Sequence, residues 1–283
     1  MATVVGVLHP GEMGAALGAV LRARGHAVLW ASEGRSEATS ARAAAANLED
    51  VGSVSELVRR SEIVLCVCPP DAALGVASTV SQLDFSGVYI DANAISPMTS
   101  RSACEQVVVG GATYVDAGIV GPPPGPTAET RLYLAGGAAP RVAALLGPPV
   151  RTIVLDAAPG AASALKMVYA AWTKGTAALL LAVRAAARAH GVEPALLEEW
   201  DGSIPELVGR SRSAARSAAT KGWRWVGEME EIAATLASVE LPPGFHEAAA
   251  EIFRRAPHLD AAELDDEVVG KVIAALLASD PTL

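Results

Sequence analysis

Residues 6–14 read Gly-Val-Leu-His-Pro-Gly-Glu-Met-Gly, and they join the first apolar run of the chain to its first amphipathic stretch. Residues 3–8 have the composition of a buried strand, and residues 12–24 have the spacing of a helix that ends at Gly25. A turn of this kind leaves backbone N–H groups at the helix N-terminus without intrahelical partners, and such groups bind phosphate. The segment therefore predicts a strand, a phosphate-binding turn and a helix.

The following 140 or so residues repeat the alternation of strand and helix patterns. A second strand is expected over residues 27–31, a helix with a capping box over 53–60, and an apolar strand over 63–68 that stops at Pro69-Pro70. Further strands fit residues 88–91, 114–119, 132–134 and 151–155. Strands separated by helix-length segments predict a doubly wound, mostly parallel sheet covered by helices on both faces, the fold known as the Rossmann fold.

The pattern changes after residue 157. Residues 161–190 predict one long helix that ends at Gly191, and the chain beyond is helical with short Pro and Gly interruptions. We therefore expect an α/β, dinucleotide-binding domain over residues 1–156 and an all-helical substrate and dimerisation domain over 157–283. The Ala- and Leu-rich surface of the long helix needs several neighbours to cover it, which predicts a homodimer through the C-terminal helices.

The composition of the chain argues against several kinds of partner and site. The chain has 283 residues, a net charge of −9 and 51% hydrophobic residues, and the acidic balance argues against nucleic acid. The apolar run at 175–183 is too short to cross a membrane, and no export signal opens the chain, so we expect a cytoplasmic protein. The three cysteines cannot form a disulfide framework, and the histidines lack the spacing of metal ligands, so no metal site is expected.

The cofactor expected at the first turn is a nicotinamide dinucleotide, although His9 stands where the G-x-G-x-x-G fingerprint has its first glycine. A carboxylate normally follows the second strand in NAD-binding chains, whereas Ser32 takes that place here, followed by Arg35. This favours NADP over NAD, while Glu33 argues the other way. The residues assigned to the cofactor are His9, Pro10, Gly11, Glu12, Met13, Ser32, Arg35, Ser36, Cys68, Pro69, Pro70 and Asn93.

Five ordered segments, at residues 6–14, 91–97, 116–121, 131–137 and 160–166, together resemble the 6-phosphogluconate dehydrogenase-like superfamily. That superfamily includes the β-hydroxyacid dehydrogenases and, more distantly, the imine reductases. Two later runs, at 164–175 and 225–232, resemble a subgroup with a C-terminal domain of uncharacterised function. The resemblance implies a small-molecule oxidoreductase, and it implies that Lys166, near the start of the long helix, is the general acid or base. The alternative is a helix lysine that points to solvent.

The substrate side departs from the β-hydroxyacid dehydrogenase pattern. Val120 replaces a serine, and Ala170 replaces an asparagine, so two polar contacts to an acidic substrate are missing. Asn93 and Gly121, which opens a proline-rich loop, are further candidates to contact substrate. The remaining candidates lie in the helical domain, where a purely structural role is the alternative; they are Lys174, Trp225 and His246.

These residues favour an NADP-dependent oxidoreductase that acts on a small hydroxy or carbonyl compound, with Lys166 as acid or base. Two alternatives remain open. The first is an imine reductase, which the apolar Val120 and Ala170 favour, although the resemblance implies that imine reductases lack a lysine at position 166. The departures from the motifs also allow a catalytically silent NADP(H)-binding dimer.

Overall fold

The computed structural model describes residues 2–265 and 267–278. These residues form two compact units that divide between Met167 and Val168. The predicted boundary at 157 lies just after the last strand of the sheet, whereas the units divide eleven residues later, inside a helix that begins at Ala161. In the described residues no helix is long and apolar enough to span a membrane.

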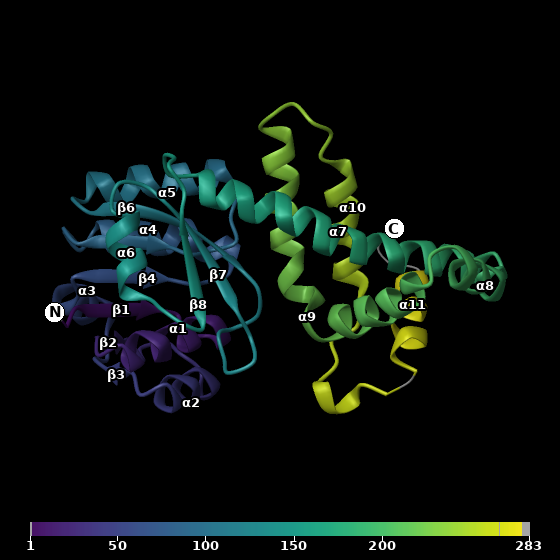
Figure 1. The fold of residues 1–283 in the computed structure, drawn as a ribbon, viewed down its shortest axis with the longest axis horizontal. Coiled ribbons are helices and arrows are strands. Elements are labelled where there is room, and N and C mark those ends of the chain that lie inside the picture. The colour runs from purple at the N-terminus through teal and green to yellow at the C-terminus, as the bar shows by residue number, and fades with distance from the viewer. Residues whose placement is uncertain (1, 266, 279–283) are drawn as a thin grey trace. The chain divides into compact units, whose positions relative to one another are not determined.

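The first unit is built on an eight-stranded sheet with the order β3-β2-β1-β4-β5-β6-β7-β8 (Figure 1). Its strands are β1 (Val4–Leu8), β2 (Ala27–Trp30), β3 (Glu49–Asp50), β4 (Ile63–Cys66), β5 (Val88–Asp91), β6 (Thr113–Val120), β7 (Thr130–Ala135) and β8 (Val150–Val154). All neighbours are parallel except β6 and β7, which form an antiparallel pair. The Rossmann-type, mostly parallel sheet expected from the sequence is confirmed.

Helices cover both faces of this sheet. They are α1 (Glu12–Ala23), α2 (Glu37–Ala45), α3 (Val54–Arg60), α4 (Ala73–Ser81), α5 (Pro97–Val109) and α6 (Ala139–Leu145), with a short 3₁₀ helix, η1 (Pro70–Ala72). Apolar side chains of α1, α2 and α6 pack into one core cluster with one face of the sheet, and those of α3, α4 and α5 pack into a second cluster on the other face. Burial on both faces explains why strands such as β4 are apolar at every position.

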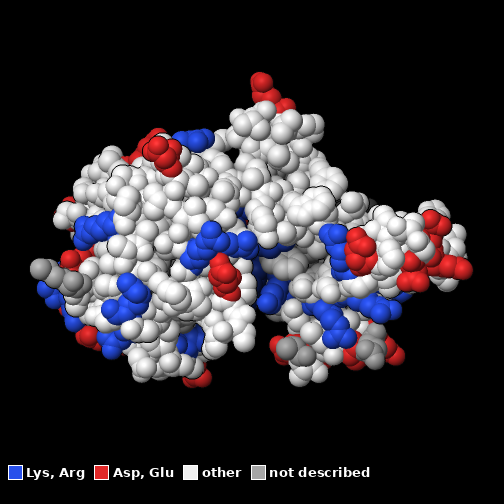
Figure 2. Space-filling view, viewed as in Figure 1, with Lys and Arg blue, Asp and Glu red and all other residues white. Residues whose placement is uncertain are grey.

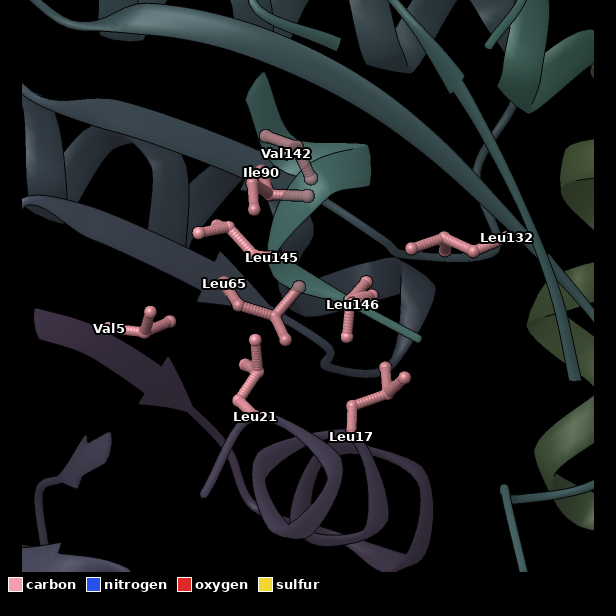
Figure 3. Close-up of a pocket in the computed structure, with 9 residues that line it drawn as sticks. All are labelled: Val5, Leu17, Leu21, Leu65, Ile90, Leu132, Val142, Leu145 and Leu146. Atoms are coloured by element: carbon pink, nitrogen blue, oxygen red, sulfur yellow. The ribbon is translucent and has the colours of Figure 1, made fainter. Parts of the chain in front are cut away.

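The first core is closely filled. Its cavity, shown in Figure 3, has a volume of about 10 Å³ and is lined only by Val, Leu and Ile side chains, among them Leu17, Leu21 and Leu65. A gap of this size holds at most about one water molecule, and its lining offers that water no polar partner. The cavity is therefore a packing gap and not a substrate site.

Helices make up the second unit. Helix α7 (Ala161–Ala189) begins in the first unit and continues into the second, which also contains α8 (Glu193–Ser203), α9 (Glu206–Ala237), α10 (Gly244–Arg255), η2 (Ala261–Glu263) and α11 (Val268–Leu277). Helices α9 and α10 lie side by side (Figure 1), with Met229 of α9 and Phe253 of α10 fully buried. Buried Arg184 of α7 holds α8 through Glu193 and α9 through Ser211. Acidic side chains gather over α8 (Figure 2).

Candidate functional site

The sheet has a topological switch point beside its first strand. Strand β1 pairs with β2 on one side and with β4 on the other, so the connections after β1 and β4 leave the carboxyl edge in opposite directions. Leu8 and Cys66, the last residues of β1 and β4, are paired in register. In open α/β sheets ligands bind outside the carboxyl ends of the strands at such a point. The turn after β1 therefore lies at the position where ligands bind in sheets of this topology.

The turn after β1 has the geometry of a phosphate-binding turn. Gly11 is the N-cap of α1, its N–H donates to the carbonyl oxygen of His9 at 2.7 Å, and no side chain caps the helix. A Cβ placed on Gly14 would lie 2.8 Å from the His9 carbonyl oxygen, so Gly14 allows the helix to approach the turn. A Cβ placed on Gly11 would meet no heavy atom within 4 Å, so this backbone is open to a ligand. Of the neighbouring candidates, Pro10 is buried and Glu12 is exposed.

His9 takes the left-handed conformation that the fingerprint assigns to glycine, with φ of 61°. Its Nδ1 lies 2.9 Å from Nη1 of Arg35, and its Nε2 lies 3.4 Å from Nη2. Burial, together with the positive charge of Arg35, lowers the pKa of His9 from 6.5 to about 4. The imidazole is therefore neutral near pH 7 and accepts a hydrogen bond from the guanidinium.

Two other candidates in the loop after β2, Ser32 and Ser36, have local partners. The Ser36 hydroxyl caps α2 by accepting from the N–H of Thr39, and the N–H of Ser32 donates to Oδ1 of Asp50. Arg35 is thus the residue of this loop that reaches the turn after β1.

Asn93 connects the loops that follow β4 and β5. Its Oδ1 accepts from the N–H of Cys68 at 2.6 Å, and its Nδ2 donates to Sγ of Cys66. Asn93 is buried, so it fixes the backbone of Cys68 just before Pro69 and Pro70. The two sulfur atoms lie 3.7 Å apart as free thiols. The hydrogen bond between them, and burial, raise the pKa of the Cys68 thiol, which therefore stays protonated.

Asp91 and Asp116 are paired in register on β5 and β6, and both are buried. Oδ1 of Asp91 accepts from the N–H of Asn93, while its Oδ2 has no hydrogen-bond partner among the described residues. Burial, with a further contribution from the charge of Asp116, raises the pKa of Asp91 to about 7.

Asp116 holds the start of α7. Its Oδ2 accepts from the N–H groups of Gly160 at 2.8 Å, Ala162 at 2.8 Å and Ser163 at 3.1 Å, and its Oδ1 accepts from the hydroxyls of Ser163 and Ser100. A carboxylate at a helix N-terminus satisfies the N–H groups that have no intrahelical partner and interacts favourably with the helix dipole. The role of Asp116 was not predicted from the sequence. The available signal was that the helix follows a glycine, Gly160, instead of a capping side chain.

Lys166 lies one turn into this helix, against β6. A Cβ placed on Gly118 would lie 2.5 Å from the Ala162 carbonyl oxygen and 3.2 Å from Cβ of Lys166, so the absent side chain of Gly118 allows α7 to approach the strand. Gly118 lies two residues beyond Asp116, past the last β5–β6 pair, and so beside the loop that carries Asn93. The half-buried Lys166 is therefore held at the carboxyl edge of the sheet.

The two candidates at the end of β6 lie beside this point. Val120 is 3% exposed, and Gly121 has a φ of 113° and begins the proline-rich loop. The hydroxyl of Thr130, the first residue of β7, donates to the carbonyl oxygen of Pro122 at 2.6 Å and so ties this loop to the strand. The edge beside Lys166 thus presents an apolar side chain and a constrained turn.

Three of the four candidates in the second unit have partners within that unit. Lys174 forms an ion pair with buried Glu228 and lies 5.3 Å above the ring of Trp225, and Trp225 packs edge-on against Phe253. These contacts favour the structural alternative for Lys174 and Trp225. Buried His246 has its Nε2 at 3.3 Å from the Ala171 carbonyl oxygen, whereas its Nδ1 has no hydrogen-bond partner in the described part of the chain. Ala170 is buried.

Comparison with known proteins identifies two matching regions. Residues 4–147 match the family model of the NAD binding domain of 6-phosphogluconate dehydrogenase, and residues 187–256 match a domain of unknown function. Both matches confirm the resemblance predicted from the five segments and from the C-terminal runs.

An uncharacterised 28.5 kDa protein of Methanothermus fervidus is 30% identical over 168 residues, which is 59% of this chain and 64% of that relative. This chain therefore covers less than two thirds of that relative. A solved conserved protein of unknown function, described as structurally similar to 3-hydroxyacid dehydrogenases, is 29% identical with a TM-score of 0.67, over 89% of this chain and 96% of the other.

The 3-hydroxyisobutyrate dehydrogenase of Mycobacterium tuberculosis, solved with L-serine, has the same fold, with a TM-score of 0.72 and 19% identity over 98% of this chain and 100% of the other.

Proposed function

We propose that this protein transfers a hydride between NADP and a small hydroxy or carbonyl compound. The premise is that the chain belongs to the family of the NAD binding domain of 6-phosphogluconate dehydrogenase, and so to the class of NAD(P)-dependent dehydrogenases and reductases. The observation that carries this proposal is the capping of α7 by Asp116, which fixes Lys166 at the carboxyl edge of a dinucleotide-binding sheet. Lys166 is the proposed acid or base.

The turn after β1 fits a dinucleotide. The open backbone at Gly11 and the uncapped N-terminus of α1 suit a pyrophosphate group. Arg35 is the cationic side chain at the end of the second strand, and no carboxylate takes the place of Ser32, so we propose NADP in preference to NAD. The exposed carboxylate of Glu33 is the feature that opposes this choice.

A bound nicotinamide supplies or accepts the hydride. The proposed task of Lys166 is to accept the hydroxyl proton at Nζ during oxidation and to return it to the carbonyl oxygen during reduction. Asp116 and Gly118 position the lysine by fixing the helix that carries it. Apolar Val120 and the constrained loop at Gly121 favour a small substrate that is less polar than a sugar acid.

The proposal is tested with purified full-length chain and two variants, Lys166→Ala and the control Lys221→Ala, whose lysine is exposed on α9. NADPH binding is measured by fluorescence titration, and turnover is measured on a panel of carbonyls and hydroxyacids. We expect Lys166→Ala to bind NADPH normally and to lose at least about 100-fold in kcat, which is the usual contribution of general acid–base catalysis. Normal turnover in Lys166→Ala would remove the lysine from the mechanism, and wild-type protein that binds neither NADPH nor NADH would refute the proposed function.

Imine reduction is the second candidate, and the buried Val120 at the end of β6 favours it, because an imine substrate needs no polar side chain there to hold a carboxylate. Reduction of a cyclic imine by Lys166→Ala would support this reaction. A rise in melting temperature with NADPH, without oxidation of NADPH by any substrate of the panel, would instead support the catalytically silent binding protein.

We also propose a homodimer through the C-terminal helices. Helix α7 exposes an apolar stripe of Val168, Trp172, Leu179 and Val183, with Trp172 65% exposed. Their spacing places them on one face of the helix, where a second copy of the chain can cover them. Trp172→Glu should therefore convert a dimer into a monomer in light scattering, whereas the exposed control Val109→Glu on α5 should not; wild-type monomers would refute the dimer.

The three free thiols suit a reducing compartment, so we place this reaction in the cytoplasm.

A further inference from the structure

His9 is an unfavourable residue for the position that it occupies. Its φ of 61° lies in the left-handed region, which costs a non-glycine residue about 1 kcal/mol relative to glycine. The backbone there would suit glycine, the residue that the fingerprint has at this position. Such strain at a ligand-binding turn points to a role for the side chain.

The side chain contacts Arg35. A guanidinium has only donors, so the nitrogen that receives its bond must be an acceptor. A neutral imidazole has one acceptor nitrogen, and the shorter of the two contacts, 2.9 Å against 3.4 Å, favours Nδ1 as that acceptor. The lowered pKa of His9 agrees with this neutral state.

A neutral partner leaves the charge of Arg35 uncompensated. Within the described residues no carboxylate forms an ion pair with Arg35, whereas Arg59 and Arg60 of α3 each pair with a glutamate. His9 therefore restricts the guanidinium without neutralising it. The N–H groups of Arg35 that do not face His9 are donors, as a phosphate group requires.

The pair of His9 and Arg35 also links the ends of two neighbouring strands, β1 and β2. His9 follows β1 directly, Arg35 follows β2, and the two strands are neighbours paired through Val7 and Trp30. In a dinucleotide-binding sheet the adenosine ribose lies across the carboxyl ends of these two strands, where an arginine accommodates the 2′-phosphate.

We propose that His9 is a positioning residue that holds Arg35 ready for the 2′-phosphate, and that this contact determines how strongly the site prefers a phosphorylated adenosine ribose. The inference rests on the proposed use of NADP, and it assigns the preference to the turn after β1 as well as to the loop after β2. The strained conformation is then the cost of placing an acceptor opposite Arg35.

The test uses full-length chain and two fragments, 2′,5′-ADP and 5′-AMP, whose dissociation constants are measured by calorimetry. Two substitutions probe His9 from opposite sides. His9→Gly removes the ring and relieves the backbone, whereas His9→Phe keeps a ring and removes both nitrogen atoms. Arg35→Ala removes the phosphate ligand itself, and Arg59→Ala, an exposed arginine on α3, is the control.

We expect wild type and Arg59→Ala to prefer 2′,5′-ADP, and Arg35→Ala to lose about 100-fold in that preference, the value of a charge-assisted contact. Both His9 variants should lose about tenfold, with the dissociation constant of 5′-AMP changed less than about twofold. The double variant His9→Gly with Arg35→Ala should lose no more of the preference for 2′,5′-ADP than Arg35→Ala alone, because both residues act through one contact.

Any other result contradicts either the role of His9, the choice of NADP or the proposed function. If Arg35→Ala loses the preference and both His9 variants keep it, the positioning role is wrong and the proposed function stands. If His9→Gly loses the preference and His9→Phe keeps it, ring shape is responsible and not the acceptor nitrogen. Wild type that binds NADH in preference to NADPH removes the choice of NADP and the role of His9 together, and wild type that binds neither refutes the proposed function as well. His9→Gly alone decides the role if His9→Phe does not fold.

Discussion

Removing the Asp116 carboxylate should destabilise the first unit far more than removing an ordinary helix cap. In Asp116→Ala the N–H groups of Gly160, Ala162 and Ser163 lose their acceptor, and the site is fully buried. Each buried donor left without a partner costs about 1–3 kcal/mol, and water entering the vacated space recovers part of this. We therefore expect the free energy of unfolding to fall by about 3–5 kcal/mol.

The isosteric Asp116→Asn separates hydrogen bonding from charge. Its amide oxygen can still accept from the three N–H groups, and its NH₂ group can donate to the Ser100 and Ser163 hydroxyls, so the loss is mainly the interaction of a negative charge with the helix dipole. That interaction contributes up to about 2 kcal/mol in a partly buried site. The predicted order of stability is wild type, then Asp116→Asn, then Asp116→Ala.

The assay is urea unfolding followed by circular dichroism, with Ser53→Ala as the control. Ser53 caps α3 through one bond, to the N–H of Glu56 at 3.2 Å, and losing such a cap costs about 1 kcal/mol. If Asp116→Ala costs no more than Ser53→Ala, the carboxylate does not hold the start of α7 and does not fix the position of Lys166.

Three further outcomes follow from the same region. Asp91 has a pKa of about 7 in the folded chain, against an ordinary value of 3.8. Between about pH 4 and pH 7 the folded chain therefore keeps this proton, whereas the unfolded chain has lost it. The free energy of unfolding should fall as the pH rises through this window, by up to about 1.4 kcal/mol per pH unit. Asp91→Asn should remove this slope in urea midpoints measured at pH 5 and pH 7, and an unchanged slope would contradict the assignment. Gly118→Ala must displace α7, because the new Cβ would lie 2.5 Å from the Ala162 carbonyl oxygen; unfolding should become easier by about 1–3 kcal/mol, and turnover that depends on Lys166 should fall by up to about 100-fold. Gly11→Ala should leave the melting temperature unchanged, since no atom lies within 4 Å of the added Cβ, yet it should weaken NADPH binding by at least about tenfold in a fluorescence titration, and unaltered binding would place the cofactor elsewhere.

The features that the sequence predicted well depend on neighbouring residues. The turn at residues 6–14, the cap of α3 and the limits of α7 to within one residue are all local patterns of glycine, capping side chains and apolar spacing. The reversal of direction between β6 and β7 was not foreseen, because a proline-rich connection shows that the chain turns and not how the strands pair.

The contacts that build the site are the ones that could not be predicted. Asp116 contacts a helix start 44 residues away, and Arg35 contacts His9 across 26 residues. The structural ion pair of the second unit, Lys174 with Glu228, likewise joins residues 54 positions apart. Composition and periodicity describe which face of an element is buried, but they do not specify which polar groups meet on that face. Two of these contacts left a signal in the sequence. The long helix has no capping side chain of its own, and a histidine stands where the fingerprint has a glycine.

The anchoring of α7 at its first turn also determines which changes of chain length this protein can tolerate. One residue inserted between Ser163 and Lys166 would rotate the lysine by about 100° around the helix axis, away from β6, even if every side chain were retained. An insertion at residues 122–129, between two strands that already reverse direction, would lengthen a loop and rotate nothing. Among homologues we therefore expect gaps to accumulate in that connection and to be absent from the short stretch between the anchored N–H groups and the lysine.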